Sequence, residues 1–208
     1  KDLGTTVTLG GTLVAMFFVA GMRLSHLFAL AGGSTSLLYY AITSEEYRLK
    51  RITAFMDPFA DKLDTGWQAV QSLYAIGSGG LFGLGLGKSR QKFFYIPESY
   101  NDFIFSIIGE ELGFLGCLVV MILLLIVLWR GIVIALRIED TFGCFLATGI
   151  TALVAIQSLI HIAVVTSSIP TTGITLPFVS YGGTSLLVNM AAIGILLNIS
   201  RHANLERS

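Results

Sequence analysis

The run from Leu118 to Trp129 contains no charged, hydroxyl or amide side chain, and it belongs to an apolar stretch near residues 112–129 that can be extended to about 136. A helix needs about 20 mostly apolar residues to cross a bilayer core of about 30 Å. Four more uncharged runs lie near residues 5–22, 24–43, 141–167 and 181–200. Only 12% of the 208 residues are charged, against about 25% in soluble domains. The chain is therefore predicted to be an all-α membrane protein, a polytopic helical bundle of about five transmembrane helices.

The short connections between these runs carry basic residues on one side only. The connection from 168 to 180 has no Lys or Arg, whereas the other short connections and the C-terminal end contain Arg23, Arg130, Arg137, Arg201 and Arg207. Lys and Arg accumulate in short cytoplasmic connections, and long loops are largely exempt from this rule. We therefore predict a multi-pass plasma-membrane protein with a cytoplasmic C-terminus and a large extracellular loop over residues 44–103.

That loop contains seven of the thirteen basic residues, although the net charge of the chain is zero. Lys88, Arg90 and Lys92 alternate with other residues, so they would lie on one side of an extended segment. Attraction to lipid headgroups is one interpretation. A clamp for a lipid-linked diphosphate is the other, because charge-assisted hydrogen bonds to phosphate are strong. No nucleic-acid partner is expected.

The glycine-rich stretch before these basic residues ends in Gly87-Lys88-Ser89, which matches the end of a nucleotide phosphate-binding loop. The full pattern requires glycine at position 82, where this chain has Phe82. Nucleotide binding is therefore not expected. A glycine-rich backbone could still form an anion-binding concavity.

A short amphipathic helix is predicted just before the glycines, from Thr65 to Tyr74. Gln68 and Gln71 lie one turn apart on the same face of this helix. The helix is expected either to lie on the membrane surface or to be a solvated connector.

Three carboxylates, Asp102, Glu110 and Glu111, lie where the loop enters the third apolar run. A carboxylate at the edge of hydrocarbon loses hydration, so it tends to be retained there when a partner or a reaction needs it. Asp102 is predicted either to act as a general base or to cap the following helix. Glu110 and Glu111 would point about 100° apart on a helix, so one of them is expected to face a cavity. A divalent cation could bridge a carboxylate and a diphosphate, although no ligand spacing establishes a metal site.

Two features of the last third of the chain add further candidates. Gln157 and His161 share a helical face, with His161 either a satisfied buried side chain or a proton shuttle. Residues 170–183 contain two prolines and three glycines, so they cannot form one continuous helix. We expect this stretch to fold beside Asp102, where Ser180 and Tyr181 would line the site.

Several blocks of sequence follow one another in the order of a known family. They are Leu3-Gly4-Thr5, Gln71-Ser72, Ala75-Ile76-Gly77-Ser78-Gly79-Gly80, Asp102-Phe103-Ile104-Phe105, Gly109-Glu110-Glu111-Leu112-Gly113 and Leu176-Pro177-Phe178-Val179-Ser180-Tyr181-Gly182-Gly183. Together they resemble the SEDS family of cell shape, elongation, division and sporulation proteins, with the FtsW and SpoVE branch nearest and RodA next.

The resemblance implies a peptidoglycan glycosyltransferase that polymerises lipid II, a polyprenyl-diphosphate-linked disaccharide peptide, at the outer face of the plasma membrane. It also implies a class B penicillin-binding protein as partner. Family members have about ten spans, so residues 1–208 are expected to be the C-terminal part of one integral membrane domain. The resemblance leaves open whether the protein serves division, elongation or sporulation.

The catalytic aspartate of the family falls on Asp102. The candidate substrate-binding residues are Lys88, Arg90, Lys92, Gln71, Glu111, Ser180 and Tyr181. The sequence departs from the family pattern in two places, because Tyr100-Asn101 replaces the usual His-Thr and His161 stands where Asn is usual.

Two other functions stay open. A lipid II flippase or other transporter would place polar residues along a path near mid-membrane, where Gln157, His161 and Asn189 are the candidates. The carboxylates gather at the outer edge instead, which favours chemistry there. A non-catalytic scaffold for a penicillin-binding protein would have similar lipid-facing helices, so the sequence separates it poorly.

Overall fold

The computed structural model describes residues 3–44, 51–53, 55–56, 66–89 and 100–203. No strand occurs among them, and the main helices are α1 (Leu3–Val19), α2 (Leu24–Thr43), α4 (Trp67–Gly79), α5 (Ile104–Arg137), α6 (Thr141–Val165) and α7 (Gly183–Ser200). The predicted all-α class is confirmed for this part of the chain. Each of the predicted apolar runs forms a helix, and the ends agree within a few residues except at the start of α5.

Three of the described helices, α5, α6 and α7, are long and apolar enough to cross a membrane. Helix α1 is also apolar, and its 17 residues extend about 25 Å at a rise of about 1.5 Å per residue. Helix α2 has 20 residues but includes a run of two glycines and three hydroxyl side chains, residues 32–36. The chain is therefore a multi-pass membrane protein with three to four candidate spans.

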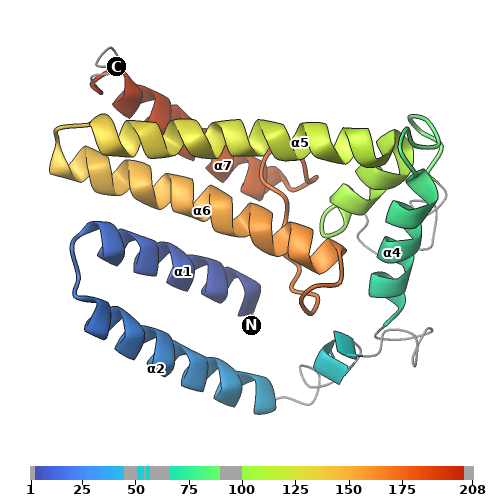
Figure 1. Cartoon of the computed structure of the whole chain (residues 1–208), viewed down its shortest axis with the longest axis horizontal. Helices are drawn as coiled ribbons and strands as arrows, with labels where there is room; N and C mark the ends of the chain where they lie inside the picture. Colours follow the sequence, from blue (N-terminus) through green and yellow to red (C-terminus); the bar gives the residue numbers. More distant parts are fainter. Residues whose placement is uncertain (1–2, 45–50, 54, 57–65, 90–99, 204–208) are drawn as a thin grey trace.

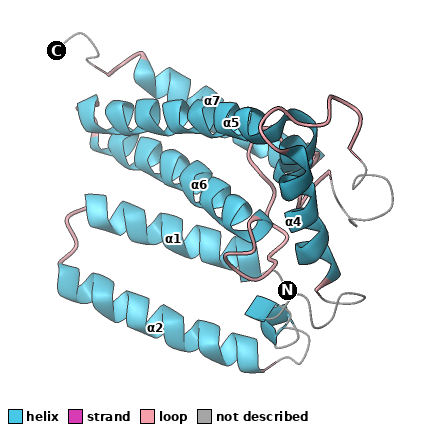
Figure 2. Ribbon diagram, turned by 45° about the vertical axis from the view of Figure 1, so that its right-hand side comes forward, coloured by secondary structure: helices cyan, strands magenta, loops and turns pink. Residues whose placement is uncertain are grey.

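Helix α6 lies at the centre of the bundle. Figures 1 and 2 show α1 and α5 on either side of it, with α2 outside α1. Small residues allow the close approach of α1 to α6, because Gly11 faces Ile156 and Gly149 faces Met16. None of the α2 side chains that the structure describes is buried. The buried hydrophobic side chains of the helices consequently come from α4, α5, α6 and α7.

Helix α5 contains a break at Gly113, whose φ of 69° and ψ of −166° are not helical. Figure 1 shows that the segment before the break turns back from the long segment after it and runs beside α4. A Cβ atom at position 113 would lie 2.6 Å from backbone atoms of Leu81, so this turn requires glycine. The break divides α5 into a short helix, 104–112, and a long apolar span, 114–137.

The glycine-rich loop that follows α4 pairs with the backbone at this break. Groups at a helix end lose their helical hydrogen-bond partners and need others. The N–H groups of Leu84, Gly85, Phe114 and Leu115 donate to the carbonyl oxygens of Glu110, Glu111, Gly80 and Leu81, respectively, over distances of 2.9, 3.0, 2.9 and 3.2 Å. The loop and the break therefore form one hydrogen-bonded junction.

Helix α4 is longer than predicted, and it is packed into the helical bundle. It was expected on the membrane surface or as a solvated connector, but it packs against α5, and Val70 and Ala75 are buried in the contact. The Ser72 hydroxyl donates a 2.8 Å hydrogen bond to the carbonyl oxygen of Val165 at the end of α6. The solvated connector was therefore wrong, whereas the position of α4 relative to the membrane surface stays a prediction.

Candidate functional site

Asp102 lies just before the short first segment of α5. The N-cap of α5 is Phe103, whose side chain makes no capping hydrogen bond, and the helix begins at Ile104. The residue at the N-cap position is therefore Phe103 and not Asp102, and acceptance of a backbone N–H of this helix by the Asp102 carboxylate stays a prediction. Phe103 is 2% exposed and anchors the helix start in an apolar cluster with Val165 and Leu176. The half-buried Asp102 is thereby held at the edge of the packed core.

The connection between α6 and α7, residues 166–182, lies directly against Asp102. A Cβ atom built on Gly173 would lie 3.5 Å from Oδ2 of Asp102, and Gly173 has a φ of 75°. The N–H of Tyr181 donates a 2.9 Å hydrogen bond to the carbonyl oxygen of Tyr100. The prediction that this connection folds beside Asp102 is confirmed.

Ser180 and Tyr181 have different environments in this connection. The buried Ser180 hydroxyl donates a 2.7 Å hydrogen bond to the carbonyl oxygen of Asn101 and accepts one of 2.7 Å from the N–H of Leu176. Tyr181 is 83% exposed. Phe178, which lies between Leu176 and Ser180 in the sequence, adopts a φ of 66°. This is a costly conformation for a residue with a bulky side chain. The hydrogen bonds of Ser180 thus hold a strained turn beside the candidate base.

His161 joins α6 to the same connection. Its side chain is fully buried, and Nδ1 lies 2.8 Å from the carbonyl oxygen of Ile174. A carbonyl oxygen only accepts, so Nδ1 carries the proton in this hydrogen bond. The buried Nε2 atom has no hydrogen-bond partner in the part of the chain that the structure describes, so the satisfied side chain and the proton shuttle both stay predictions.

Arg51 is a residue of this region that the sequence reasoning did not select. Its Nη1 atom donates a 2.9 Å hydrogen bond to the carbonyl oxygen of Thr171. Thr171 is two residues from Gly173, which faces Asp102. In the sequence Arg51 is one of seven basic residues in the loop, and no local pattern distinguishes it from the others.

The two glutamates of α5 hold the end of the glycine-rich loop. The carboxylate of Glu111 accepts hydrogen bonds from the N–H of Gly87 at 3.0 Å and of Ser89 at 3.3 Å. The Ser89 hydroxyl donates to the carboxylate of Glu110, and both side chains are about 1% exposed. The N–H groups of Gly87 and Ser89 are therefore already occupied by the Glu111 carboxylate, and the rest of the expected anion-binding concavity stays a prediction.

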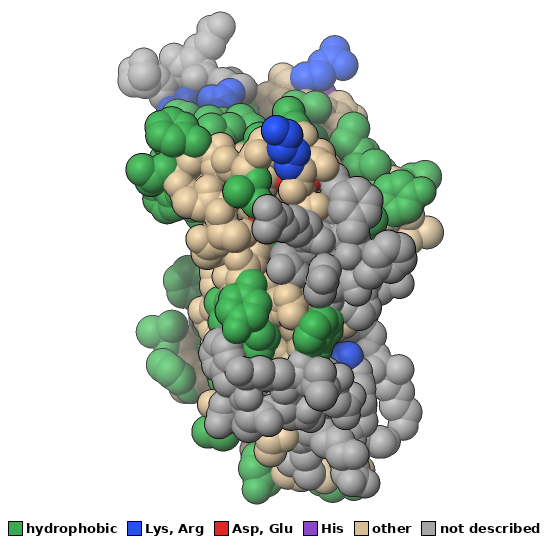
Figure 3. All heavy atoms as spheres, turned by 90° about the vertical axis from the view of Figure 1, so that its right-hand side faces the viewer, with side chains coloured by type: hydrophobic (Ala, Val, Ile, Leu, Met, Phe, Trp, Pro, Cys, Tyr) green, Lys and Arg blue, Asp and Glu red, His purple; other side chains and the backbone are tan. Residues whose placement is uncertain are grey.

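Lys88 lies in this loop, at the opposite end of segment 104–112 from Asp102. Ile104 and Glu111 are seven residues apart, which is about 10 Å along a helix axis. Figure 3 faces this end of the molecule and shows basic side chains at separate places on it. Lys88 is exposed, whereas Gln71 is buried in α4 at 7% exposure. Arg90 and Lys92 lie outside the described residues.

No group of three or more His, Cys, Asp or Glu side chains suited to a metal ion occurs in the part of the chain that the structure describes. The carboxylates of Glu110 and Glu111 are instead engaged with Ser89 and the loop backbone. The role of a divalent cation stays a prediction.

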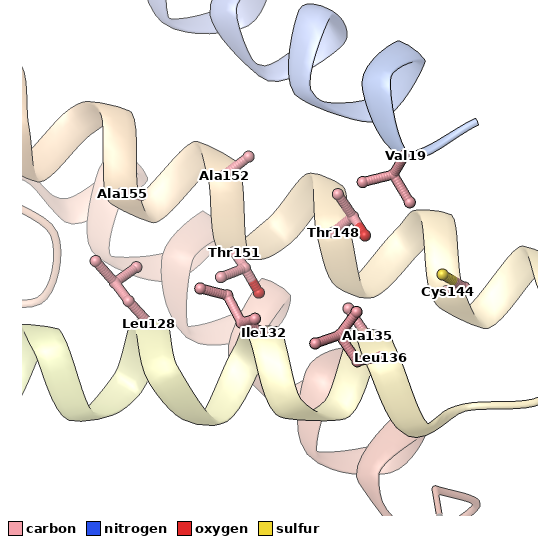
Figure 4. A pocket seen from close by; sticks show the side chains of 10 residues that line it. All are labelled: Val19, Leu128, Ile132, Ala135, Leu136, Cys144, Thr148, Thr151, Ala152 and Ala155. Atoms are coloured by element: carbon pink, nitrogen blue, oxygen red, sulfur yellow. The ribbon is translucent and has the colours of Figure 1, made fainter. Parts of the chain in front are cut away.

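An apolar cavity of about 300 Å³ lies between α5, α6 and the end of α1 (Figure 4). Val19, Ile132, Ala152 and Thr148 are among the side chains that surround it. The residues of α6 that line it lie between Cys144 and Ala155, whereas His161 lies near the end of that helix. It therefore has no part in the chemistry around Asp102.

Comparison with known proteins identifies the family. Residues 1–205 match the family described as cell cycle protein, which is named for FtsW, RodA and SpoVE. The chain belongs to this family. The predicted SEDS resemblance is thereby confirmed.

Two relatives of this SEDS chain illustrate the match. It is 52% identical over 202 residues to stage V sporulation protein E of Bacillus subtilis and 49% identical over 201 residues to the "probable peptidoglycan glycosyltransferase FtsW" of Trichlorobacter lovleyi. These alignments cover 97% and 96% of this chain but only 55% and 52% of the relatives. The chain thus spans about half the length of the curated relatives it matches.

A solved structure has the same fold as this SEDS chain. It is described as "Structural coordination of polymerization and crosslinking by a peptidoglycan synthase complex", and one of its chains superposes with a TM-score of 0.75 at 24% identity. The superposition covers 99% of this chain and 57% of that one. Nearly all of the helical arrangement described above is therefore found in that structure.

Proposed function

We propose that the protein is a peptidoglycan glycosyltransferase that polymerises lipid II into glycan strands at the outer face of the plasma membrane. The observation that carries this proposal is the placement of Asp102 at the end of segment 104–112, against the connection that contains Gly173 and Ser180. Relatives named as probable peptidoglycan glycosyltransferases support it. The biological setting would be division, elongation or sporulation.

Asp102 is the proposed general base. In each transfer its carboxylate accepts the proton of a sugar hydroxyl, and the hydroxyl oxygen forms a bond to the anomeric carbon of the donor. The bond from that carbon to the diphosphate oxygen breaks, and its electron pair leaves with the lipid diphosphate. General-base assistance of this kind is worth about 10² to 10⁴ in rate.

The other proposed substrate contacts differ in the support that their environments give. Tyr181 and Lys88 are exposed and can meet a substrate without rearrangement. Ser180 and Glu111 already make hydrogen bonds within the protein, and Gln71 is buried. Their roles as substrate ligands, and those of Arg90 and Lys92, are carried forward as predictions.

We also propose the topology that the basic residues predict, with five spans in this part of the chain. Residues 44–103 and the connection before α7 would lie outside the cell, and the C-terminus would lie in the cytoplasm. A crosslinking enzyme of the class B penicillin-binding type is the proposed partner. The solved relative, described as a complex for polymerisation and crosslinking, supports this choice.

The test is Asp102→Asn in the full-length protein, because asparagine keeps the shape of aspartate and removes its basicity. We expect polymer formation from purified lipid II to fall at least about 10²-fold with expression unchanged. Asp140→Asn is the matched control, since Asp140 caps α6 by accepting from Gly143 at 2.7 Å and asparagine is an equally good cap. Near-normal polymerisation by Asp102→Asn would remove Asp102 from this role.

The same reconstituted assay separates the alternatives. Movement of lipid II across the bilayer without polymer would favour a transporter. Activity that survives Asp102→Asn but disappears when partner contact is blocked would favour a scaffold.

A further inference from the structure

We propose that Arg51 binds the diphosphate group of the lipid-linked donor and stabilises the charge that develops on it as the sugar is transferred. The proposal rests on the function proposed above, and it assigns to Arg51 the role of principal diphosphate contact, which the sequence pattern had given to Lys88, Arg90 and Lys92. The position of the guanidinium carries the inference.

Two contacts with the α6–α7 connection place Arg51 near Asp102. The Arg51 Nη1 atom donates to the carbonyl oxygen of Thr171 at 2.9 Å. Two residues further on, Gly173 turns toward Oδ2 of Asp102, so closely that a Cβ atom there would lie 3.5 Å from it. Consecutive Cα atoms are about 3.8 Å apart, so Thr171 and Gly173 are separated by no more than about 8 Å. One short stretch of backbone therefore has the cation at one end and the carboxylate at the other.

The backbone between these contacts is held from other sides. His161 donates from Nδ1 to the carbonyl oxygen of Ile174. A Cβ atom built on Gly4, at the start of α1, would lie 2.8 Å from the Ile174 side chain and 3.1 Å from the Thr172 carbonyl oxygen, so α1 approaches this stretch closely. Because α6 and α1 both fix this stretch, the hydrogen bond to Thr171 orients Arg51 on a rigid support.

The chemistry of the transfer requires a cation on the opposite side of the reacting sugar from the base. The departing diphosphate gains negative charge while the base accepts a proton on the other side of the reacting carbon, so the two groups must flank one sugar unit. Of the basic residues of the loop that the structure describes, Arg51 and Lys88, only Arg51 adjoins backbone that touches Asp102. Lys88 lies beyond the far end of segment 104–112, where Gly87 and Ser89 bind Glu111.

Arginine also suits this ligand by its geometry. Its guanidinium has five N–H donors in a planar fork that matches phosphate oxygens, and the bond to Thr171 uses an Nη1 hydrogen. Lysine would supply a point charge without this fork. Replacing Arg51 by lysine should therefore remove most of the affinity for diphosphate even though the charge remains.

The experiment measures binding, separately from turnover, in the full-length protein reconstituted in nanodiscs of neutral lipid. The ligands are a polyprenyl diphosphate and the polyprenol of the same chain length, and the quantity is the ratio of their dissociation constants. We expect Arg51→Gln to weaken diphosphate binding at least about tenfold and to leave polyprenol binding unchanged. The diphosphate affinity of Arg51→Lys should lie between those of Arg51→Gln and the parent. Arg130→Gln is the same kind of change near the C-terminal end of α5, away from the site, and it should leave the ratio of dissociation constants unchanged.

Each contrary result has a distinct meaning. An unchanged ratio in Arg51→Gln overturns the proposal, and so does an equal loss for both ligands, which would make Arg51 only a clamp on the connection. If Arg51→Gln does not fold, Arg51→Lys decides, and an unchanged ratio there overturns the proposal as well. Competition by anionic phosphatidylglycerol as strong as that by the diphosphate would assign Arg51 to bilayer headgroups and overturn it too.

Polymerisation of lipid II by the parent protein tests the proposed function independently. If the parent binds diphosphate through Arg51 but forms no polymer, the binding site stands and the glycosyltransferase proposal fails. If the parent forms polymer and Arg51→Gln keeps the full binding ratio, the proposed function stands and the assignment of Arg51 fails.

Discussion

The hydroxyl of Ser180 donates a 2.7 Å hydrogen bond to the carbonyl oxygen of Asn101, the residue before Asp102. The Ser180 hydroxyl oxygen also accepts a 2.7 Å hydrogen bond from the N–H of Leu176. One buried side chain thus closes the turn at 176–180 and ties it to the peptide that carries the candidate base. The position of the Asp102 carboxylate depends on segments that are far apart in the sequence.

Replacing Ser180 by alanine should therefore lower both stability and activity. The N–H of Leu176 and the carbonyl of Asn101 lose a buried partner, and each such loss costs about 1–3 kcal/mol. We expect a lower melting temperature in detergent and a slower polymerisation of lipid II. Ser168→Ala is the control, because its hydroxyl is exposed and Thr166 is its one side-chain partner among the described residues. If Ser180→Ala behaves like this control, the tie to Asn101 does not matter for the site.

Two glycines of α4 should respond oppositely to alanine. A Cβ atom on Gly79 would overlap the carbonyl oxygen of Gly109, whereas one on Gly77 meets no atom within 4 Å. We expect Gly79→Ala to separate α4 from segment 104–112 and to lower the melting temperature strongly. Gly77→Ala should be neutral or stabilising by up to about 1 kcal/mol, because alanine has a higher helix propensity than glycine and position 77 is exposed. Equal melting temperatures for the two variants would contradict this packing.

The buried contact between Ser89 and Glu110 should appear as a coupling energy. A hydrogen bond to a charged group contributes about 1.5–3 kcal/mol. We expect Ser89→Ala and Glu110→Gln each to destabilise the protein, and the double variant to cost less than the sum. Reversible thermal unfolding of the four proteins measures the cycle. Strict additivity would show that the two side chains act independently.

The proposed orientation predicts which cysteines an impermeant thiol reagent labels in intact cells. Cys117 is buried and Cys144 is half-buried, so both are first replaced by serine or alanine. Ser168→Cys, in the exposed connection after α6, should react from outside. Glu139→Cys, between α5 and α6, should react only after the membrane is permeabilised. The reverse pattern would place Asp102 on the cytoplasmic side and refute the proposed function.

The long apolar helices could be predicted from the sequence because an uncharged run of about 20 residues is enough to identify such a helix. The run Leu118–Trp129 lies in the middle of the long segment of α5, and the expected start near residue 112 coincides with the break at Gly113. Segment 104–112 was not predicted as a separate helix. Nothing in the sequence states that a helix reverses at one glycine, because that reversal requires the backbone of residues 80–85 as a partner.

The candidate site could be predicted only in part. Asp102 and the connection containing Ser180 were placed together correctly, because both adjoin helix ends on the same side of the bundle. Arg51 was missed, since its contact with Thr171 joins residues 120 positions apart. One of the two glutamates was expected to face a cavity, but the structure engages Glu110 with Ser89 and Glu111 with the loop backbone.

The junction at Gly113 also limits how this molecule can move. Opening it would break four backbone hydrogen bonds at once and leave the peptide groups at the break without their partners. Segment 104–112 is therefore no hinge, and α4 and the start of α5 must travel together as one rigid hairpin. Any closure over a bound sugar has to come from the opposite wall, where the backbone around Gly173 faces the carboxylate.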